Sequence, residues 1–119
     1  YNFDGIDIDW EYPGFADHSG TTSDKQNFTL LLQQVKDSIT TLGYTNGKNY
    51  KLSACFSADP TKADDIEWSN ISPLLDMINL MSYDFFGAFD CKANHNAPLY
   101  APTSGDPNFN IHSAFTIAY

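Results

Sequence analysis

Apolar positions follow two different periods in the first half of the chain. Over residues 3–10 apolar and acidic residues alternate, a period of two that predicts a β-strand. From residue 24 onward apolar residues recur every three or four positions, and this stripe predicts an amphipathic helix: Phe28, Leu31, Leu32, Val35, Ile39 and Leu42. We expect Ser23 and Gln26 to form a capping box at the start of this helix, and Gly43 to end it.

The second half of the chain continues the alternation of strands and helices. We expect strands over residues 50–58 and 77–83, with one or two helical turns between them that are broken around Pro73. A long loop over residues 85–108 follows, and Asn110 is the expected cap of a last helix. Such alternation is typical of parallel strands joined by helical crossovers, so we predict an α/β fold that is part of a barrel or of a doubly wound sheet.

Composition and charge narrow the class of partner. Hydrophobic residues make up 42% of the 119 residues and aromatic residues 15%, which excludes a disordered tail. No apolar run reaches the ~20 residues that cross a bilayer. The net charge of −9 and the lack of a Lys/Arg cluster argue against nucleic acid and against an anionic membrane surface. A neutral substrate such as a polysaccharide is compatible with this charge.

The cysteines and histidines give no sign of a metal or a cofactor. Cys55 and Cys91 are too few and too far apart for a metal knuckle, and we interpret them as one buried strand thiol and one loop thiol. A disulfide between them stays open as an alternative. The three histidines lack the spacing of metal ligands: His18, His95 and His112. We therefore expect no structural metal and no cofactor.

The candidate chemistry lies in a row of three carboxylates on the first strand. Asp7, Asp9 and Glu11 point to one face of that strand, with successive side chains ~6.6 Å apart. The apolar residues between them should be buried against other elements, so we expect a buried strand. Repulsion and burial should then raise the pKa of at least one carboxyl group, which would keep a proton for general acid chemistry. Glu11 lies nearest the carboxyl end of the strand, where parallel barrels place their active sites. A solvated edge strand and a calcium site are weaker interpretations, because the opposite face is apolar and no EF-hand loop follows.

Two motifs carry a resemblance to a known family. Residues 4–13, DGIDIDWEYP, resemble the signature of glycoside hydrolase family 18, which lies on the fourth strand of a TIM barrel. Residues 81–84, MSYD, resemble a second family motif at the expected distance, on the sixth strand, and their continuation is similar to the bacterial chitinase A subgroup. The resemblance covers essentially the whole chain. It implies a fragment of a TIM (β/α)8 barrel, from about strand 4 to the helix after strand 6.

The resemblance also implies a domain boundary. Residues 1–119 would be the central part of a family 18 catalytic domain, because the chain begins at Tyr1 without a methionine and ends at Tyr119 inside an expected helix. Three strands cannot close a barrel, and they leave two open sheet edges. We therefore expect the isolated piece to be inactive and poorly folded, and the full-length protein to be a monomer.

The resemblance assigns roles to individual residues. Glu11 would protonate the glycosidic oxygen and later activate water. Asp9 would orient the substrate's 2-acetamido group, whose carbonyl oxygen attacks the anomeric carbon, and Asp7 would share a proton with Asp9. Tyr83 would hydrogen-bond the acetamido carbonyl. The implied substrate-binding residues are Met81, Asp84, Tyr12 and Phe86.

The function implied by the resemblance is that of an endo-acting chitinase secreted from the cell. It would hydrolyse β-1,4 bonds of N-acetylglucosamine polymers by a substrate-assisted retaining mechanism, with chitin or chitooligosaccharides as its partners. Two alternatives are a chitin-binding lectin on the same barrel and an endo-β-N-acetylglucosaminidase that acts on N-glycans. The lectins typically lose the acid that corresponds to Glu11, and the glucosaminidases generally lack the MSYD context, so both fit this sequence less well.

Overall fold

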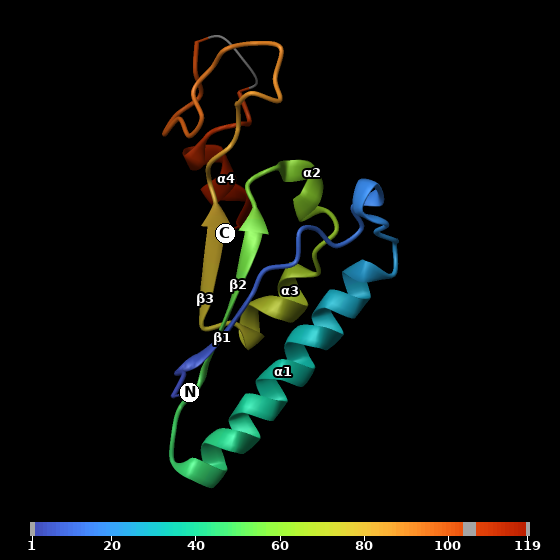
Figure 1. Cartoon of the computed structure of the whole chain (residues 1–119), viewed down its shortest axis with the longest axis vertical. Coiled ribbons are helices and arrows are strands. Elements are labelled where there is room, and N and C mark those ends of the chain that lie inside the picture. Colours follow the sequence, from blue (N-terminus) through green and yellow to red (C-terminus); the bar gives the residue numbers. More distant parts are fainter. Residues whose placement is uncertain (1, 104–106, 119) are drawn as a thin grey trace.

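Three parallel strands form the sheet of this chain. The computed structural model describes residues 2–103 and 107–118, and Figure 1 shows their arrangement. The strands β1 (Gly5–Ile8), β2 (Lys51–Ser57) and β3 (Met77–Met81) pair in the order β1-β2-β3, both pairs parallel. This confirms the predicted parallel α/β architecture, although each strand is shorter than the residue pattern predicted. The helices are η1 (Ala16–His18), α1 (Asp24–Asn46), α2 (Pro60–Ala63), α3 (Trp68–Ile71), η2 (Ser72–Leu74) and α4 (Ile111–Ala118).

The hydrophobic core lies between the sheet and α1. Alternate residues of β2 are buried on the side of α1, and Figure 1 shows this long helix lying along the sheet. The Trp10 ring meets the Phe28 ring edge-on, with centroids 5.8 Å apart, so Trp10 faces the helical layer. Each large side chain that becomes fully buried contributes about 1.5–3 kcal/mol. The buried residues of this core are Phe28, Leu32, Ile39, Leu52, Ala54, Phe56, Ile66 and Ile71.

The capping box predicted at the start of α1 is wrong. Ser23 already has helical backbone angles, φ −70° and ψ −20°, and its side chain makes no capping hydrogen bond. A capping side chain needs an extended backbone to reach the free N–H groups. The Asp24 carboxylate takes over the local contacts, because its Oδ2 atom accepts hydrogen bonds from Thr21 N at 2.9 Å and Gly14 N at 3.2 Å. Asp24 therefore ties the loop that follows β1 to the first turn of α1.

The predicted end of α1 at Gly43 is also wrong. The helix continues to Asn46 and ends at Gly47, whose φ of 73° is left-handed and whose N–H donates to Gly43 O at 2.8 Å. Gly43 is buried, and a Cβ atom there would collide with the carbonyl oxygen of Lys48. Gly43 is therefore needed for the close return of the chain toward β2, while Gly47 provides the stop.

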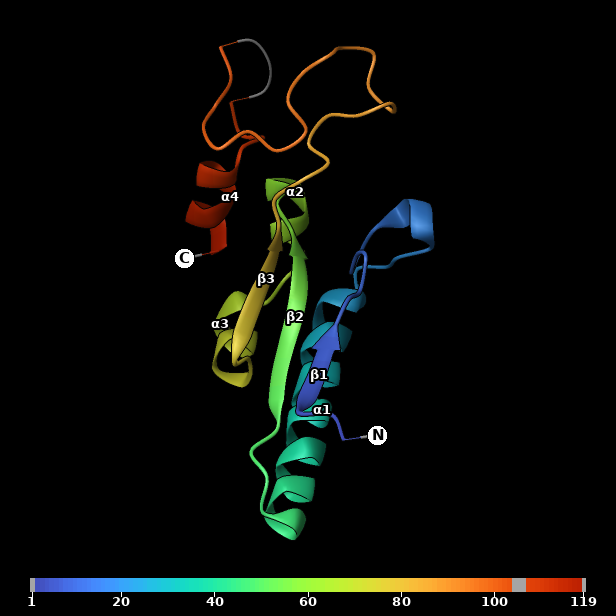
Figure 2. The same cartoon turned by 60° about the vertical axis from the view of Figure 1, so that its left-hand side comes forward.

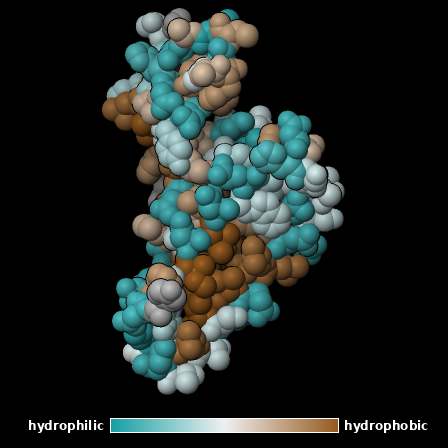
Figure 3. All heavy atoms as spheres, in the orientation of Figure 1, coloured by the Kyte–Doolittle hydropathy of each residue, from teal (hydrophilic) through white to brown (hydrophobic). Residues whose placement is uncertain are grey.

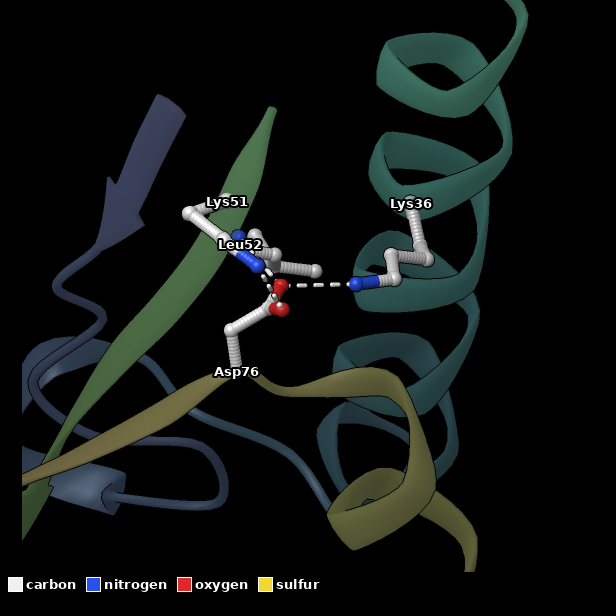
Figure 4. A network of polar contacts seen from close by, with 4 residues as sticks. All are labelled: Lys36, Lys51, Leu52 and Asp76. Carbon is white, nitrogen blue, oxygen red and sulfur yellow. Dashed lines mark hydrogen bonds and ion pairs between the residues drawn. The ribbon is translucent and has the colours of Figure 1, made fainter. Parts of the chain in front are cut away.

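Asp76 joins the start of β3 to both β2 and α1. Its Oδ2 atom accepts from Lys36 Nζ at 2.7 Å and from Leu52 N at 3.0 Å, and its Oδ1 atom accepts from Lys51 Nζ at 3.1 Å (Figure 4). The hydrogen bond from Lys36, followed by that from the Leu52 amide, holds the pKa of Asp76 below its usual range. This network fixes the amino ends of the strands, at the opposite end of the sheet from the predicted site.

The opposite face of the sheet is open. The side chains of Asp7, Asp9 and Glu11 are exposed, which contradicts the expected burial of the carboxylate row. The reason is that, within the described residues, the buried core forms on the α1 side of the sheet alone. At the free edge of β1, the apolar residues Phe3, Ile6 and Leu42 are exposed and line a hollow of ≈ 230 Å³. Figure 3 shows an apolar area on this side of the molecule, where β1 and α1 lie.

The long loop after β3 returns to a small second core. Phe85 is buried there with Ala58 and Ala114, so the loop packs against the end of β2 and against α4. The predicted cap of the last helix is confirmed, since Ser113 N donates to Asn110 Oδ1 at 3.0 Å directly before α4. Of the helices in the described residues, none has the length and apolar character of a membrane span.

Candidate active site

A cleft opens where the three strands end. All described strands run in the same direction, so their carboxyl ends meet at one end of the sheet, below the segment that follows β3 (Figure 2). The cleft has a volume of ≈ 400 Å³ and receives residues from beyond each strand. It is lined by Glu11, Tyr12, Ser57, Ala58, Asp59, Met81, Tyr83, Asp84, Phe85 and Phe109.

Most of the predicted site residues come together in this cleft. Five of the eight line it, from two segments 70 residues apart: Glu11, Tyr12, Met81, Tyr83 and Asp84. Asp7 lies on β1 and Asp9 directly follows the strand, so both are closer to the amino end of the sheet than Glu11. Phe86 does not line the cleft; its ring packs edge-on against Phe109, with centroids 6.4 Å apart. Its predicted contact with substrate stays a prediction.

The carboxylate of Asp7 is surrounded by donors from the neighbouring strands. Its Oδ1 atom accepts from Ser53 Oγ at 2.5 Å and from Asn79 Nδ2 at 3.0 Å, while its Oδ2 atom accepts from Cys55 Sγ at 3.4 Å. Burial, followed by the hydrogen bond to Asp7, raises the pKa of the Cys55 thiol to about 11. Cys55 thus stays a neutral donor, and both Cys55 and Cys91 are free thiols. These three contacts hold the carboxylate group of Asp7 in place at the base of the row.

Glu11 lies beyond the last residue of β1 and projects into the cleft. The peptide bond between Glu11 and Tyr12 is cis, and the Glu11 carbonyl oxygen lies 3.0 Å from Nδ1 of His18. Burial raises the pKa of Tyr12 to about 12, with a further contribution from its hydrogen bond to Glu11. Tyr12 is therefore a neutral phenol throughout the physiological range, and it holds its proton beside the Glu11 carboxyl group.

Asp84 is fixed by the long loop. Its backbone has a left-handed φ of 54°, which Asp tolerates better than most residues, and its Oδ1 atom accepts from Asn96 Nδ2 at 2.8 Å. The Asn96 carbonyl oxygen in turn accepts from Phe85 N at 2.9 Å. Asn96 therefore anchors Asp84 and Phe85 together at the rim of the cleft.

Several residues of the site were not predicted from the sequence. Ser57 lies opposite Met81 in the sheet register, and Asp59 caps α2 by accepting from Thr61 N at 2.9 Å. The alternation of small polar and apolar residues along β2 is the signal that marks Ser53, Cys55 and Ser57 as one face. In the described part of the chain, no group of three or more His, Cys, Asp or Glu side chains is arranged to hold a metal ion.

Comparison with known proteins decides the family. The family described as Glycosyl hydrolases family 18 matches residues 1–119. The chain belongs to glycosyl hydrolase family 18. Its residues are 40% identical to Chitinase A1 of Niallia circulans over 122 aligned residues, which cover 99% of this chain and 18% of that protein. The chain thus spans about a fifth of the length of this relative.

Solved structures of other proteins share the fold of the chain. Chitinase ChiA74 from Bacillus thuringiensis has a TM-score of 0.91 at 42% identity, covering 98% of this chain and 20% of that one. A family 18 N-acetylglucosaminidase from Paenibacillus barengoltzii has a TM-score of 0.90 at 32% identity, covering 97% of this chain and 34% of that one. Two further similar structures were solved with chitooligosaccharides. The predicted family is therefore confirmed, and the names of the relatives include two kinds of enzyme.

Proposed function

We propose that this family 18 chain forms the catalytic centre of an endo-acting chitinase that cleaves β-1,4 bonds between N-acetylglucosamine units. One observation carries the proposal: Glu11 from the end of β1 and Tyr83 from the end of β3 line the same cleft. A carboxylic acid and a phenol that converge on one space provide a proton donor and a hydrogen-bond donor for a sugar with an acetamido group. The chitinase names of the relatives support the same substrate class.

The proposed mechanism uses the substrate's own acetamido group as the nucleophile. Glu11 donates its proton to the glycosidic oxygen while the acetamido carbonyl oxygen attacks the anomeric carbon, so the leaving sugar departs as an alcohol. Asp9 stabilises the positive charge that develops on the acetamido group, and Tyr83 orients the carbonyl by a hydrogen bond. The Glu11 carboxylate then takes a proton from water, which attacks the anomeric carbon from the face of the departed sugar. Two displacements at this carbon retain its configuration.

The open face of the sheet supports this assignment. Three donors hold the Asp7 carboxylate group in place, and in the proposal Asp7 shares a proton with Asp9. Met81 would form the floor below the sugar, and Asp84, held by Asn96, would contact its polar groups. In the complete protein, further strands would cover this face and exclude water.

We infer that the chain is the central part of a TIM (β/α)8 barrel. β1, β2 and β3 would be strands 4, 5 and 6, and residues 1–119 part of a larger catalytic domain. The hollow at the free edge of β1 supports this placement, because a preceding strand with its helix would cover the exposed Ile6 and Leu42. The protein would act outside the cell, because its polymeric substrate lies there. We propose that the full-length protein is a monomer.

A second candidate is an N-acetylglucosaminidase activity, because one of the similar structures bears that name. The two activities differ in their products. Digestion of N-acetylchitohexaose by the full-length protein should give internal cleavage products, with the newly formed end in the β configuration by proton NMR. Release of N-acetylglucosamine alone from the first minutes, or release of N-glycans from a glycoprotein without cleavage of the hexamer, would contradict the chitinase assignment. Binding of the hexamer without any cleavage would identify a lectin.

A further inference from the structure

The loop after β1 is joined to α2 by a cluster centred on Phe15. Nζ of Lys62, a residue of α2, lies 3.7 Å from the centroid of the Phe15 ring. The Phe15 ring also meets the rings of His18 and Tyr12 edge-on, with centroids 4.9 Å and 6.2 Å apart. We call Phe15, His18 and Lys62 the loop clasp. It connects the loops that follow two adjacent strands, β1 and β2.

The loop clasp reaches Glu11 through the Glu11 carbonyl oxygen and through the neighbouring residue Tyr12. His18 Nδ1 lies 3.0 Å from the Glu11 carbonyl oxygen and donates to it when the proton is on Nδ1. Tyr12 follows Glu11 directly in the chain. Its ring packs on Phe15, and its ring centroid lies 5.9 Å from Lys62 Nζ. A shift of the clasp would therefore move the backbone from which the Glu11 side chain projects.

Glu11 needs such support, because the strand does not hold it. β1 ends at Ile8, so no ladder hydrogen bond reaches Glu11, and its side chain is exposed. A proton donor acts well when it is held within about 0.5 Å of its productive position. Asp24 fixes the loop on the α1 side through Gly14 and Thr21. The loop clasp holds the same loop on the side of α2, through the contact between Lys62 and Phe15.

Lys62 provides the attraction in this cluster. Its side chain is half-buried, and among the described residues it takes part in no ion pair. An ammonium group within about 6 Å of an aromatic ring is attracted to its negative face, and more strongly when water is partly excluded. The distance of 3.7 Å between Lys62 Nζ and the centroid of the Phe15 ring is well inside this range. The charge of Lys62 therefore attracts the loop that carries Phe15 to α2.

We propose that Lys62, Phe15 and His18 are positioning residues for Glu11, and that the loop clasp sets the geometry of proton donation to the glycosidic oxygen. The proposal rests on the proposed function of Glu11 as the proton donor. The clasp lies outside the cleft lining, so it should govern the chemical step and leave substrate binding nearly unchanged.

The test compares three variants of the full-length protein on a fluorogenic N,N′-diacetylchitobiose substrate. Lys62→Met keeps most of the length of the side chain and removes its charge, while Lys62→Arg keeps a cation for the Phe15 ring. His18→Phe keeps the ring contact and removes the donor to Glu11 O. We expect kcat to fall about 10-fold in Lys62→Met and His18→Phe, with KM and the thermal midpoint close to those of the wild type. Lys62→Arg should restore kcat to within about two-fold.

The matched control is Lys25→Met. Lys25 Nζ donates to Asp64 O at 2.5 Å, so it also ties a helix to the segment after β2, without touching the loop that carries Glu11. Its kcat should equal that of the wild type. If Lys62→Met and His18→Phe cleave as fast as Lys25→Met, or if they raise KM alone, the loop clasp does not position Glu11. If the wild type does not cleave the substrate, the proposed function itself fails, and the clasp proposal fails with it.

Discussion

Replacing Asp76 by Asn should destabilise the protein while leaving its active-site residues intact. The variant retains an oxygen for the Leu52 amide but loses the charge that attracts Lys36 and Lys51. The Lys36 pair is about three-quarters buried on both sides and the Lys51 pair is more exposed, so their losses are about 1 and about 0.3 kcal/mol. Weakening the charge-assisted bond to Leu52 adds about 0.5 kcal/mol. We expect a total of roughly 2 kcal/mol, which lowers the thermal midpoint of a domain of about 150–250 residues by about 4–8 °C.

The stability that Asp76 contributes should depend on pH in a definite direction. The pKa of Asp76 is lower in the folded protein than in the unfolded chain, so its contribution is present above pH ~4 and is lost as the pH falls through the folded value. The difference between wild type and Asp76→Asn should therefore be full at pH 7 and shrink below pH ~4. Urea unfolding followed by circular dichroism measures it. Asp37→Asn is the control, because Asp37 lies on the surface of α1 and its carboxylate accepts from Gln33 Nε2 within the same helix. Equal stability of the two variants, or a difference that does not shrink in acid, would refute the reasoning.

Three further results follow from the structure. Cys55 should react with iodoacetamide at pH 8 about 100-fold more slowly than a thiol of ordinary pKa. Mass spectrometry should find the label on the exposed Cys91, and equal labelling of both cysteines would contradict the raised pKa of Cys55. Gly43→Ala should cost about 2 kcal/mol or more in urea unfolding, because its methyl group meets the Lys48 carbonyl; an unchanged midpoint would show that the chain relaxes there. The hydrolysis rate should fall as the pH rises, because the proposed mechanism needs a carboxylic acid that carries a proton, whereas a rate that stays flat from acid to strongly alkaline pH would exclude a carboxylic acid donor.

Local periodicity was sufficient to predict the layers of the fold and much of the site. The alternation of apolar and acidic residues correctly predicted a strand where β1 lies, although β1 ends at Ile8, before Asp9 and Glu11. The same parity placed Met81 and Tyr83 together, and both line the cleft. These predictions succeeded because each depends on neighbours a few residues away.

The features that were missed depend on contacts between distant segments. The start of α1 is fixed by the Asp24 carboxylate, which reaches Gly14 ten residues earlier, and no capping pattern contains that contact. The burial of the carboxylate row was predicted from the cost of exposing the apolar side of the strand. In the structure α1 covers only that apolar side, and the side with the carboxylates is left exposed. Lys62 and Phe15 are 47 residues apart, and only the folded chain places them in contact.

Glu11→Gln tests the central claim most directly. The variant keeps the size of the side chain and its position beside Tyr12, and removes the proton that the mechanism donates. Glu67→Gln is the matched control, because Glu67 accepts from Thr29 Oγ1 away from the cleft. With full-length protein and a fluorogenic N,N′-diacetylchitobiose substrate, Glu11→Gln should lose at least ~10³-fold in kcat while still binding chitin, and Glu67→Gln should cleave normally. Cleavage by Glu11→Gln at a rate close to that of Glu67→Gln would contradict the assignment of Glu11 as the catalytic acid.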